Sequence, residues 1–441
     1  MGLRETIDDA PMTRFQWSVV VVCVLLNMID GFDVLVMAFT AGSVGAEWGL
    51  TGAQTGLLLS AGLVGLALGS LLVAPWADRI GRRPVILGCL VVAGVAMLAS
   101  SVSRDAVQLG LLRVVTGVGI GGILAGSNVI ASEYASRRWR GFAVSLNSTG
   151  YALGATLGGV VAAVLIGGAG WRAVFVFGGV VTLLAVPLVF LRLPESLDFL
   201  VTRRPAGALE RVNALAARLG QAAQPGLPDV AGAPDGVGAG FRELLSPRLR
   251  RTTLVLWVAF FGVMAGFYFV TSWTPTLLVE SGLTPGQGIA GGTLLNVGGI
   301  FGAALLGLLA ARFALRDVLI AYLLVTAALL AGFLTATSSL ALAFALGGAI
   351  GLFVNGCVAG LYALTPGIYD AGVRTTGVGT ALGIGRAGAI LAPALAGVLL
   401  DGGATPQALY LAVGAIFVVV AAVLVPLRAV APVPTTAKEL S

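Results

Sequence analysis

Apolar stretches long enough to cross a lipid bilayer recur along almost the whole of this 441-residue chain. A spanning helix needs about 20 mostly apolar residues. Only 10% of the residues are charged, whereas soluble domains carry roughly 25%. The sequence therefore predicts an all-α membrane protein with twelve transmembrane helices, near residues 15–40, 53–75, 84–102, 107–132, 141–166, 171–191, 252–278, 288–311, 317–336, 339–366, 376–400 and 406–427.

Basic residues predict how these helices are oriented. Lys and Arg accumulate on the cytoplasmic side of membrane proteins. With both termini in the cytoplasm, 22 of the 26 basic residues fall on that side. Of the other four, Arg104 and Arg172 lie outside and Arg113 and Arg386 lie within spans. We therefore expect cytoplasmic termini and a lipid bilayer around the helices.

A long polar interval, residues 192–250, separates the spans into two sets of six. We expect an N-terminal six-helix half over 1–191, a cytoplasmic central loop over 192–250, and a C-terminal half with a short tail over 251–441. Residues 221–240 are rich in Gly, Pro and Ala and predict a flexible linker. Before them, Leu209 to Leu219 has the apolar spacing of a short helix, which either lies on the membrane surface or is an ordinary linker helix.

Several missing residue types exclude whole classes of chemistry. The chain has no His, and its only Lys is Lys438. A Ser-His-Asp triad, a His-based metal site and a phosphate-binding loop with its lysine are therefore excluded. Cys23, Cys89 and Cys357 lie inside apolar segments and predict buried free thiols. We expect no enzyme activity, no cofactor, no metal ion and no nucleic-acid partner.

Two acidic residues, Asp30 and Asp33, interrupt the first apolar segment near its middle. A carboxylate at membrane depth costs several kcal/mol unless it faces water, a partner or a proton. Residues three apart share a helix face, so Asn27, Asp30 and Asp33 form one polar stripe. The stripe predicts a site for protons or for cargo crossing the membrane. The alternative is that both acids are structural partners of an arginine.

The depth of these charges follows from helix geometry. At about 1.5 Å per residue, Asp30 lies roughly 22 Å from the cytoplasmic start of its helix, and Arg113 lies about 10 Å from the outer surface. Both fall in the outer half of the bilayer, with Asp33 slightly higher, so an Arg–Asp pair would offset part of the desolvation of each charge. Below Arg113, Gly117 and Gly121 repeat at an interval of four and allow close helix contact.

Other polar side chains within the spans are candidates for lining a pathway. Arg386 lies about eleven residues into its span, nearer the midplane. Tyr268 belongs to an aromatic cluster in the seventh span, which either stacks on an aromatic substrate or faces lipid. The remaining candidates, which helix packing explains nearly as well, are Asn147, Tyr151 and Asn296.

The turn after the second span reads Asp78-Arg79-Ile80-Gly81-Arg82-Arg83, and basic residues recur after the eighth span at Arg312 and Arg316. This motif resembles the signature of the major facilitator superfamily, although Ala74 replaces its opening glycine. The resemblance covers essentially the whole chain. It implies two pseudo-symmetric six-helix halves and a transporter that functions as a monomer.

Further motifs resemble one branch, the aromatic acid:proton symporters of bacteria. They are Asp30-Gly31-Phe32-Asp33, Ser132-Glu133-Tyr134, the sequence from Leu193 to Leu200, and Gly383-Ile384-Gly385-Arg386. Tyr369-Asp370 departs from the Tyr-Pro expected there. The resemblance implies import of a benzoate-type or hydroxybenzoate-type carboxylate with protons across the inner membrane. The alternatives are a proton-coupled transporter for another solute (a sugar, another metabolite or a drug) and a non-transporting membrane sensor.

The resemblance and the depth of the charges together suggest residue roles. An aromatic carboxylate is bound bidentately by Arg113 or Arg386 while Asp30 or Asp33 takes up a proton. The alternative for Arg113 is a structural or proton-relay role. The alternative for Arg386 is a role in gating or packing. Glu133 either pairs with the motif arginines as a gate or carries the proton. The motif residues either lock one conformation or only fix topology; they are Asp78, Arg79, Arg82 and Arg83.

Overall fold

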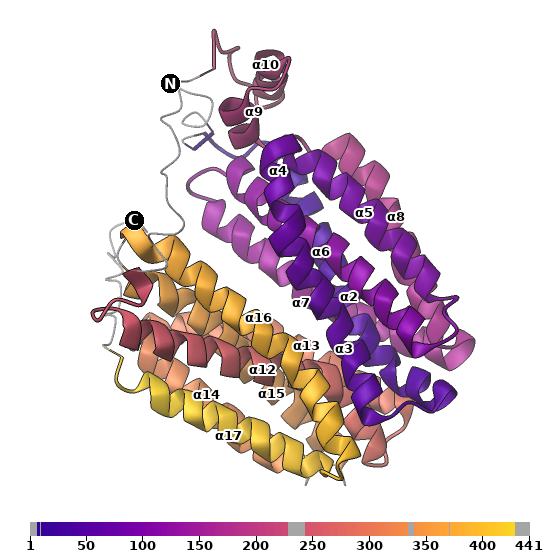
Figure 1. Cartoon of the computed structure of the whole chain (residues 1–441). Helices are drawn as coiled ribbons and strands as arrows, with labels where there is room; N and C mark the ends of the chain where they lie inside the picture. The colour runs from indigo at the N-terminus through magenta and orange to yellow at the C-terminus, as the bar shows by residue number, and fades with distance from the viewer. Residues whose placement is uncertain (1–6, 9, 228–242, 334–338, 370, 428–441) are drawn as a thin grey trace. The chain divides into compact units, whose positions relative to one another are not determined.

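The computed structural model describes residues 7–8, 10–227, 243–333, 339–369 and 371–427. Asp370 and most of the linker predicted for 221–240 lie outside the described residues. The described part of the chain contains no β-strand. Its principal helices (Figure 1) are α2 Arg14–Trp48, α3 Gly52–Leu68, the π-helical turn η1 Gly69–Val73, α4 Ala74–Ile80, α5 Arg82–Ser100, α6 Ala106–Tyr134, α7 Arg140–Ala169, α8 Trp171–Arg192, α9 Leu197–Arg203, α10 Ala208–Arg218, α12 Arg250–Glu280, α13 Pro285–Ala310, α14 Leu315–Phe333, α15 Leu340–Ile368, α16 Ala371–Asp401 and α17 Pro406–Leu424.

Twelve of the described helical segments are long and apolar enough to span a membrane. The prediction of twelve spans is thereby confirmed, and most boundaries differ from it by a few residues. The largest difference is in α2, which continues to Trp48 although its apolar pattern weakens after Thr40. Ala41 and Val44 are buried in this extension, and packing of this kind stabilises a helix beyond its local propensity.

The motif after the second span is not an open loop. α3, η1 and α4 run on as one helical segment through Asp78 and Arg79, and only Gly81 interrupts the helix before Arg82 begins α5. Gly81 has φ 106°, a conformation that favours glycine. The Glu195 carboxylate accepts hydrogen bonds from the backbone N–H groups of Arg82 (2.8 Å) and Arg83 (3.2 Å). The motif therefore forms two helix ends that meet at one glycine.

The chain divides into two compact units. Unit 1 comprises residues 1–40 and 61–233, and unit 2 comprises residues 41–60 and 234–441. In unit 2, the Asp401 carboxylate at the end of α16 accepts hydrogen bonds from the backbone N–H groups of Gly52 (2.6 Å) and Ala53 (2.8 Å). This contact groups the start of α3 with the second unit. The division into halves at residues 192–250 stays a prediction.

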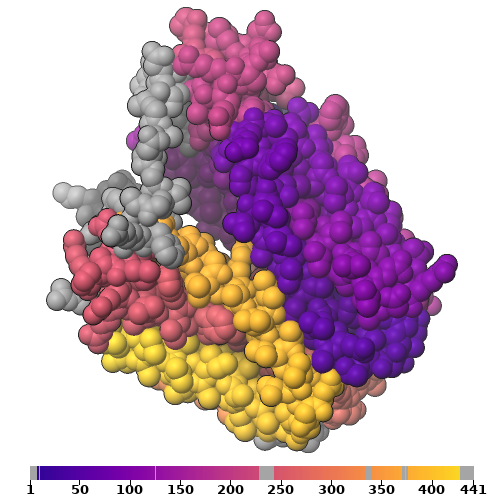
Figure 2. Space-filling view, in the orientation of Figure 1, coloured from indigo at the N-terminus to yellow at the C-terminus, as the bar shows by residue number. Residues whose placement is uncertain are grey.

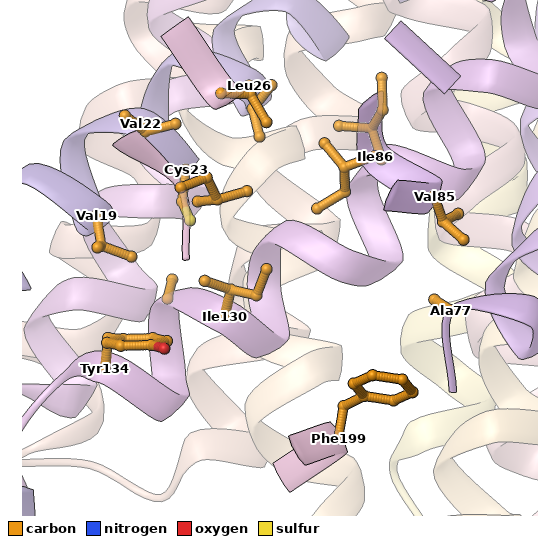
Figure 3. Packing of buried hydrophobic residues seen from close by; sticks show 14 of the residues in the cluster. Val19, Val22, Cys23, Leu26, Ala77, Val85, Ile86, Ile130, Tyr134 and Phe199 are labelled. Carbon is orange, nitrogen blue, oxygen red and sulfur yellow. The ribbon is translucent and has the colours of Figure 1, made fainter. Parts of the chain in front are cut away.

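A cluster of buried apolar side chains forms the interior of unit 1 near α9 and α10. Figure 3 shows part of it, including Cys23, Ile130 and Phe199. α10 adds Val212, Leu215 and Leu219 to the same cluster, and α9 and α10 form a compact block on the surface of the unit (Figure 2). Because protein covers its apolar face, α10 is a linker helix rather than a helix lying on the membrane surface. The three cysteines are free and buried, as expected.

Helices α2 and α7 approach each other through small residues. A Cβ at Gly31 would overlap the backbone carbonyl of Tyr151, and one at Gly154 would overlap that of Met28. Close backbone contact of this kind is typical of membrane helices that pack through glycine. Gly31 separates Asp30 from Phe32, so this contact fixes the rotation of α2 at the level of its two acids.

Replacement of Gly31 tests this packing. We expect Gly31→Ala to lower the unfolding free energy by about 1–3 kcal/mol, because the added methyl group forces α2 and α7 apart. Gly42→Ala is the matched control in the same helix, since a Cβ there meets nothing within 4 Å. Thermal unfolding in detergent measures both. Equal melting temperatures for the two variants would contradict the close contact.

Candidate functional site

The centre of unit 1 contains a buried ion pair between α2 and α6. Arg113 Nη1 donates a hydrogen bond to Asp33 Oδ1 over 2.9 Å. Arg113 Nη2 donates to Ser100 Oγ (3.1 Å) and Thr116 Oγ1 (2.9 Å), and the guanidinium carbon lies 4.9 Å from the centroid of the Phe175 ring. The side chains of Arg113 and Asp33 are only 2% and 5% exposed. Four helices, α2, α5, α6 and α8, thus supply the partners of one guanidinium.

This geometry limits what Arg113 can do in the observed conformation. Both terminal nitrogens of its guanidinium are already hydrogen-bonded within unit 1. A substrate carboxylate would therefore have to compete with Asp33 for the cation. Glycines hold α6 in place, because a Cβ at Gly117 or Gly121 would overlap the backbone of the neighbouring helix α3.

The polar stripe predicted on α2 faces the interior of unit 1. Asn27, Asp30 and Asp33 are all buried, and Asp30 is 4% exposed. Tyr151 on α7 is half-buried, and its backbone packs against Gly31 between the two acids. The stripe therefore does not face lipid.

A chain of side-chain amides extends from this stripe. Asn27 Nδ2 donates to Asn147 Oδ1 (2.7 Å), and Asn147 Nδ2 donates to Asn128 Oδ1 (2.6 Å). Asn27 Nδ2 also lies 3.4 Å from Ser127 Oγ. Asn128 was not among the predicted site residues. A polar residue within an apolar span could have marked Asn128 as a candidate. The contact between helices that brings it to Asn147 could not be predicted from the sequence.

A second polar cluster gathers around Glu133 at the end of α6. Glu133 forms an ion pair with Arg82. Its carboxylate also accepts hydrogen bonds from Ser196 Oγ (3.0 Å) and from the backbone N–H of Leu197 (3.0 Å). Glu133 is 1% exposed. The cluster ties the end of α6 to the start of α5 and of α9, and Ser196 and Leu197 were not foreseen as its members.

The four predicted gating residues have different surroundings in the structure. Arg82 lies against Glu133, whereas the Asp78 side chain is 66% exposed and only 3.5 Å from Arg82 Nη2 at its nearest oxygen. Arg79 is exposed. Arg83 lies on the Phe190 ring, 5.3 Å from its centroid. The ion pair of Arg82 and Glu133 is therefore the buried part of the predicted gate.

Unit 2 places Arg386 near the middle of α16, where its side chain is half-buried. Tyr362 of α15 lies within electrostatic reach of this guanidinium. The Tyr362 ring stands edge-on to Phe260 of α12, with centroids 5.9 Å apart and planes at 84°. Within the described residues Arg386 forms no ion pair and no side-chain hydrogen bond. In the part of the chain that the structure describes, this guanidinium thus lacks a counter-ion and lies near the Tyr362 ring, which was not foreseen.

The other predicted residues of unit 2 have local partners. Asn296 is buried and donates from Nδ2 to the carbonyl oxygen of Gly292 one turn earlier in α13 (2.9 Å). Tyr268 is half-buried on α12 and contacts Phe267 edge-on, with centroids 5.0 Å apart. Among the described residues, no group of three or more acidic or cysteine side chains could hold a metal ion.

Comparison with known proteins decides the family. A model of the Major Facilitator Superfamily matches residues 21–314. The chain belongs to the major facilitator superfamily. It also resembles a solved structure of a D-xylose-proton symporter, with a TM-score of 0.70 and 17% identity over 93% of this chain and 97% of that chain, which supports the same fold.

Relatives with higher sequence identity are named transporters. The chain is 35% identical to a gallate transporter of Pseudomonas putida, over 91% of this chain and 89% of that protein. It is 31% identical to a 4-hydroxybenzoate transporter of Acinetobacter baylyi, over 91% and 88% respectively. These similarities confirm the predicted aromatic acid:proton symporter family and a multi-pass membrane transporter rather than an enzyme.

A double-mutant cycle tests the buried pair in unit 1. Asp33→Asn and Arg113→Gln each leave one buried charge without its counter-ion, so we expect each to lower the unfolding free energy by about 3–5 kcal/mol. The double variant should lose clearly less than the sum of the two, because neither charge remains. Chemical denaturation in detergent micelles measures all four proteins. Strictly additive losses would contradict a direct pair.

Proposed function

We propose that this transporter imports a small aromatic carboxylate, of the benzoate or hydroxybenzoate class, together with protons. It does so as a monomer in a bacterial inner membrane, with both termini in the cytoplasm. The relatives named for gallate and 4-hydroxybenzoate support the substrate class. The distribution of basic residues supports the orientation.

The observation that carries this proposal is the different state of the two membrane-embedded arginines. Arg113 is neutralised by Asp33, whereas Arg386 has no counter-ion within the described residues. An uncompensated cation in a membrane protein is costly and marks a ligand site by default. A guanidinium binds a carboxylate through two parallel hydrogen bonds. Arg386 is therefore the carboxylate ligand, and the neighbouring ring of Tyr362, which is 46% exposed, suits an aromatic cargo.

Protons enter the mechanism through the acids of α2. When Asp33 is protonated, the attraction that holds Arg113 is lost, and the hydrogen bonds of α5 and α6 to that guanidinium can rearrange. Asp30, one turn away and equally buried, provides a second carboxyl group for the same proton. Substrate binding neutralises Arg386. Protonation of Asp33 releases Arg113 from its pair, so the anionic cargo and the proton each change the charge balance at one membrane-embedded arginine. This is the physical basis of the proposed coupling.

The ion pair of Arg82 and Glu133 is proposed as a gate at the basic end of the bundle. Ser196 Oγ lies within hydrogen-bonding distance of both side chains, 2.6 Å from Arg82 Nη1 and 3.0 Å from Glu133. Any movement of α6 relative to the start of α5 must break these contacts. The gate thus stabilises one conformation, and Glu133 acts as its anchor rather than as the carrier of the transported proton.

Substitution of Arg386 tests the substrate site. We expect Arg386→Ala to lower the affinity for radiolabelled 4-hydroxybenzoate at least tenfold, because it removes a charge-assisted pair worth roughly 1.5–3 kcal/mol. Arg386→Lys should retain part of the affinity, since it keeps the charge but loses the planar fork. The matched control is Arg104→Ala, which removes an exposed cation. Binding by Arg386→Ala that equals the control would exclude Arg386 as the ligand.

Proton coupling is tested separately in proteoliposomes. An inward proton gradient should drive accumulation of the labelled acid by the wild-type protein. Asp30→Asn and Asp33→Asn should lose this response while retaining exchange of labelled for unlabelled substrate, which needs no net proton movement. Asp317→Asn is the control, because Asp317 is an exposed acid that pairs with Arg316. Gradient-driven accumulation by both asparagine variants would contradict the proposed role of α2.

A further inference from the structure

An apolar groove runs along the outer surface of unit 1 between α5 and α8, which pack side by side (Figure 1). It is a shallow, open hollow of about 610 Å³. Gly88 and Pro187 help to form the hollow, because a Cβ at Gly88 would meet nothing within 4 Å. Its lining residues are Leu87, Gly88, Val91, Val92, Val186, Pro187 and Phe190.

A cation lies at one end of this groove. Arg83, Leu87 and Val91 are spaced by four residues and share one face of α5. Arg83 lies one turn before the groove, at the end of the bundle where basic residues gather. Its guanidinium carbon lies 5.3 Å from the centroid of the Phe190 ring, and Nη2 donates a hydrogen bond to the Phe190 carbonyl oxygen. The arginine is thus held against a residue that lines the groove.

The charge of Arg83 is not neutralised by the protein. Within the described residues its guanidinium forms no ion pair, and its Nε is buried without a hydrogen-bond partner. The nearby acid Glu195 accepts from the backbone N–H groups that begin α5, and the Glu133 carboxylate is taken by Arg82. The groove therefore combines apolar walls with one uncompensated positive charge at its mouth.

We propose that this groove binds an anionic phospholipid of the cytoplasmic leaflet. One acyl chain lies between α5 and α8 along Gly88, and the phosphate lies at Arg83. The groove spans roughly 7 Å of α5, from Leu87 to Val92, which suits the part of an acyl chain nearest the glycerol. Basic pockets between membrane helices on this side recognise anionic headgroups, whereas a neutral or zwitterionic lipid offers Arg83 no net charge.

Native mass spectrometry of the delipidated full-length protein in detergent tests the site. The protein is titrated with phosphatidylglycerol or with phosphatidylethanolamine, and bound copies are counted. We expect tighter binding of phosphatidylglycerol, with an affinity that falls about fivefold in Arg83→Gln. The control is Arg192→Gln, which removes an exposed charge two residues after Phe190, on the opposite side of α8 by the helical period.

A second pair of variants tests the acyl-chain position without changing charge. Gly88→Leu fills the groove and should also weaken the binding of phosphatidylglycerol. Gly307→Leu is its control on α13, because Gly307 is exposed and a Cβ there also meets nothing within 4 Å. Equal affinity for the two lipids in the wild-type protein would overturn the proposal. Unchanged binding of phosphatidylglycerol in both Arg83→Gln and Gly88→Leu would also overturn it, and so would equal losses of affinity in Arg83→Gln and Arg192→Gln. None of these outcomes depends on the transported substrate.

Discussion

The pairing of opposite charges inside a lipid-embedded helix bundle governs how unit 1 is organised. Asp33 and Arg113 are almost completely removed from solvent, and the loss of hydration costs each charge several kcal/mol. Their mutual attraction offsets part of that cost. The hydroxyl groups of Ser100 and Thr116, which accept hydrogen bonds from Arg113, and the Phe175 ring offset a further part. Close glycine contacts pack α2 against α7 and α6 against α3, and these contacts fix the two helices that carry the pair. Packing and electrostatics therefore support each other at this point.

The two units treat their membrane-embedded arginines differently. Unit 1 neutralises Arg113 with its own aspartate, whereas unit 2 leaves Arg386 without a counter-ion among the described residues. An ionisable residue at membrane depth marks a candidate functional site, and a diffusible anion is one group that can neutralise a cation there. A paired cation instead responds to protonation of its partner. The proposed division, with substrate at Arg386 and protons at the acids of α2, follows from this difference.

Much of the fold was predictable because lipid imposes a simple rule on the sequence. Hydropathy located all twelve spans, and helix rise alone placed Asp33 and Arg113 at matching depth. Depth along a helix depends only on residue number, so it transfers directly from sequence to structure. The end of α2 was predicted too early, since Ala41 and Val44 stay helical through tertiary packing that hydropathy does not report.

Contacts that depend on helix rotation could not be predicted in the same way. Asn128 meets Asn147, and Tyr362 lies near Arg386, only because particular faces of separate helices are turned toward each other. Glu195 caps α5 across more than 100 residues of sequence. Arg82 and Arg83 are adjacent in the motif, yet they point to an acid and to an apolar groove respectively. Such differences between neighbours are set by packing and not by composition.

Anionic cargo and protons are proposed to cross the membrane together, and an experiment that detects both at once can show whether they do. Proteoliposomes that contain a pH-sensitive dye are given 4-hydroxybenzoate in the external solution, with no imposed pH gradient. Protein-free liposomes correct for passive entry of the neutral acid. The interior should acidify in step with uptake, and a variant lacking both the Asp30 and the Asp33 carboxylates should show neither beyond the passive background. Substrate entry through the wild-type protein without accompanying acidification would contradict it.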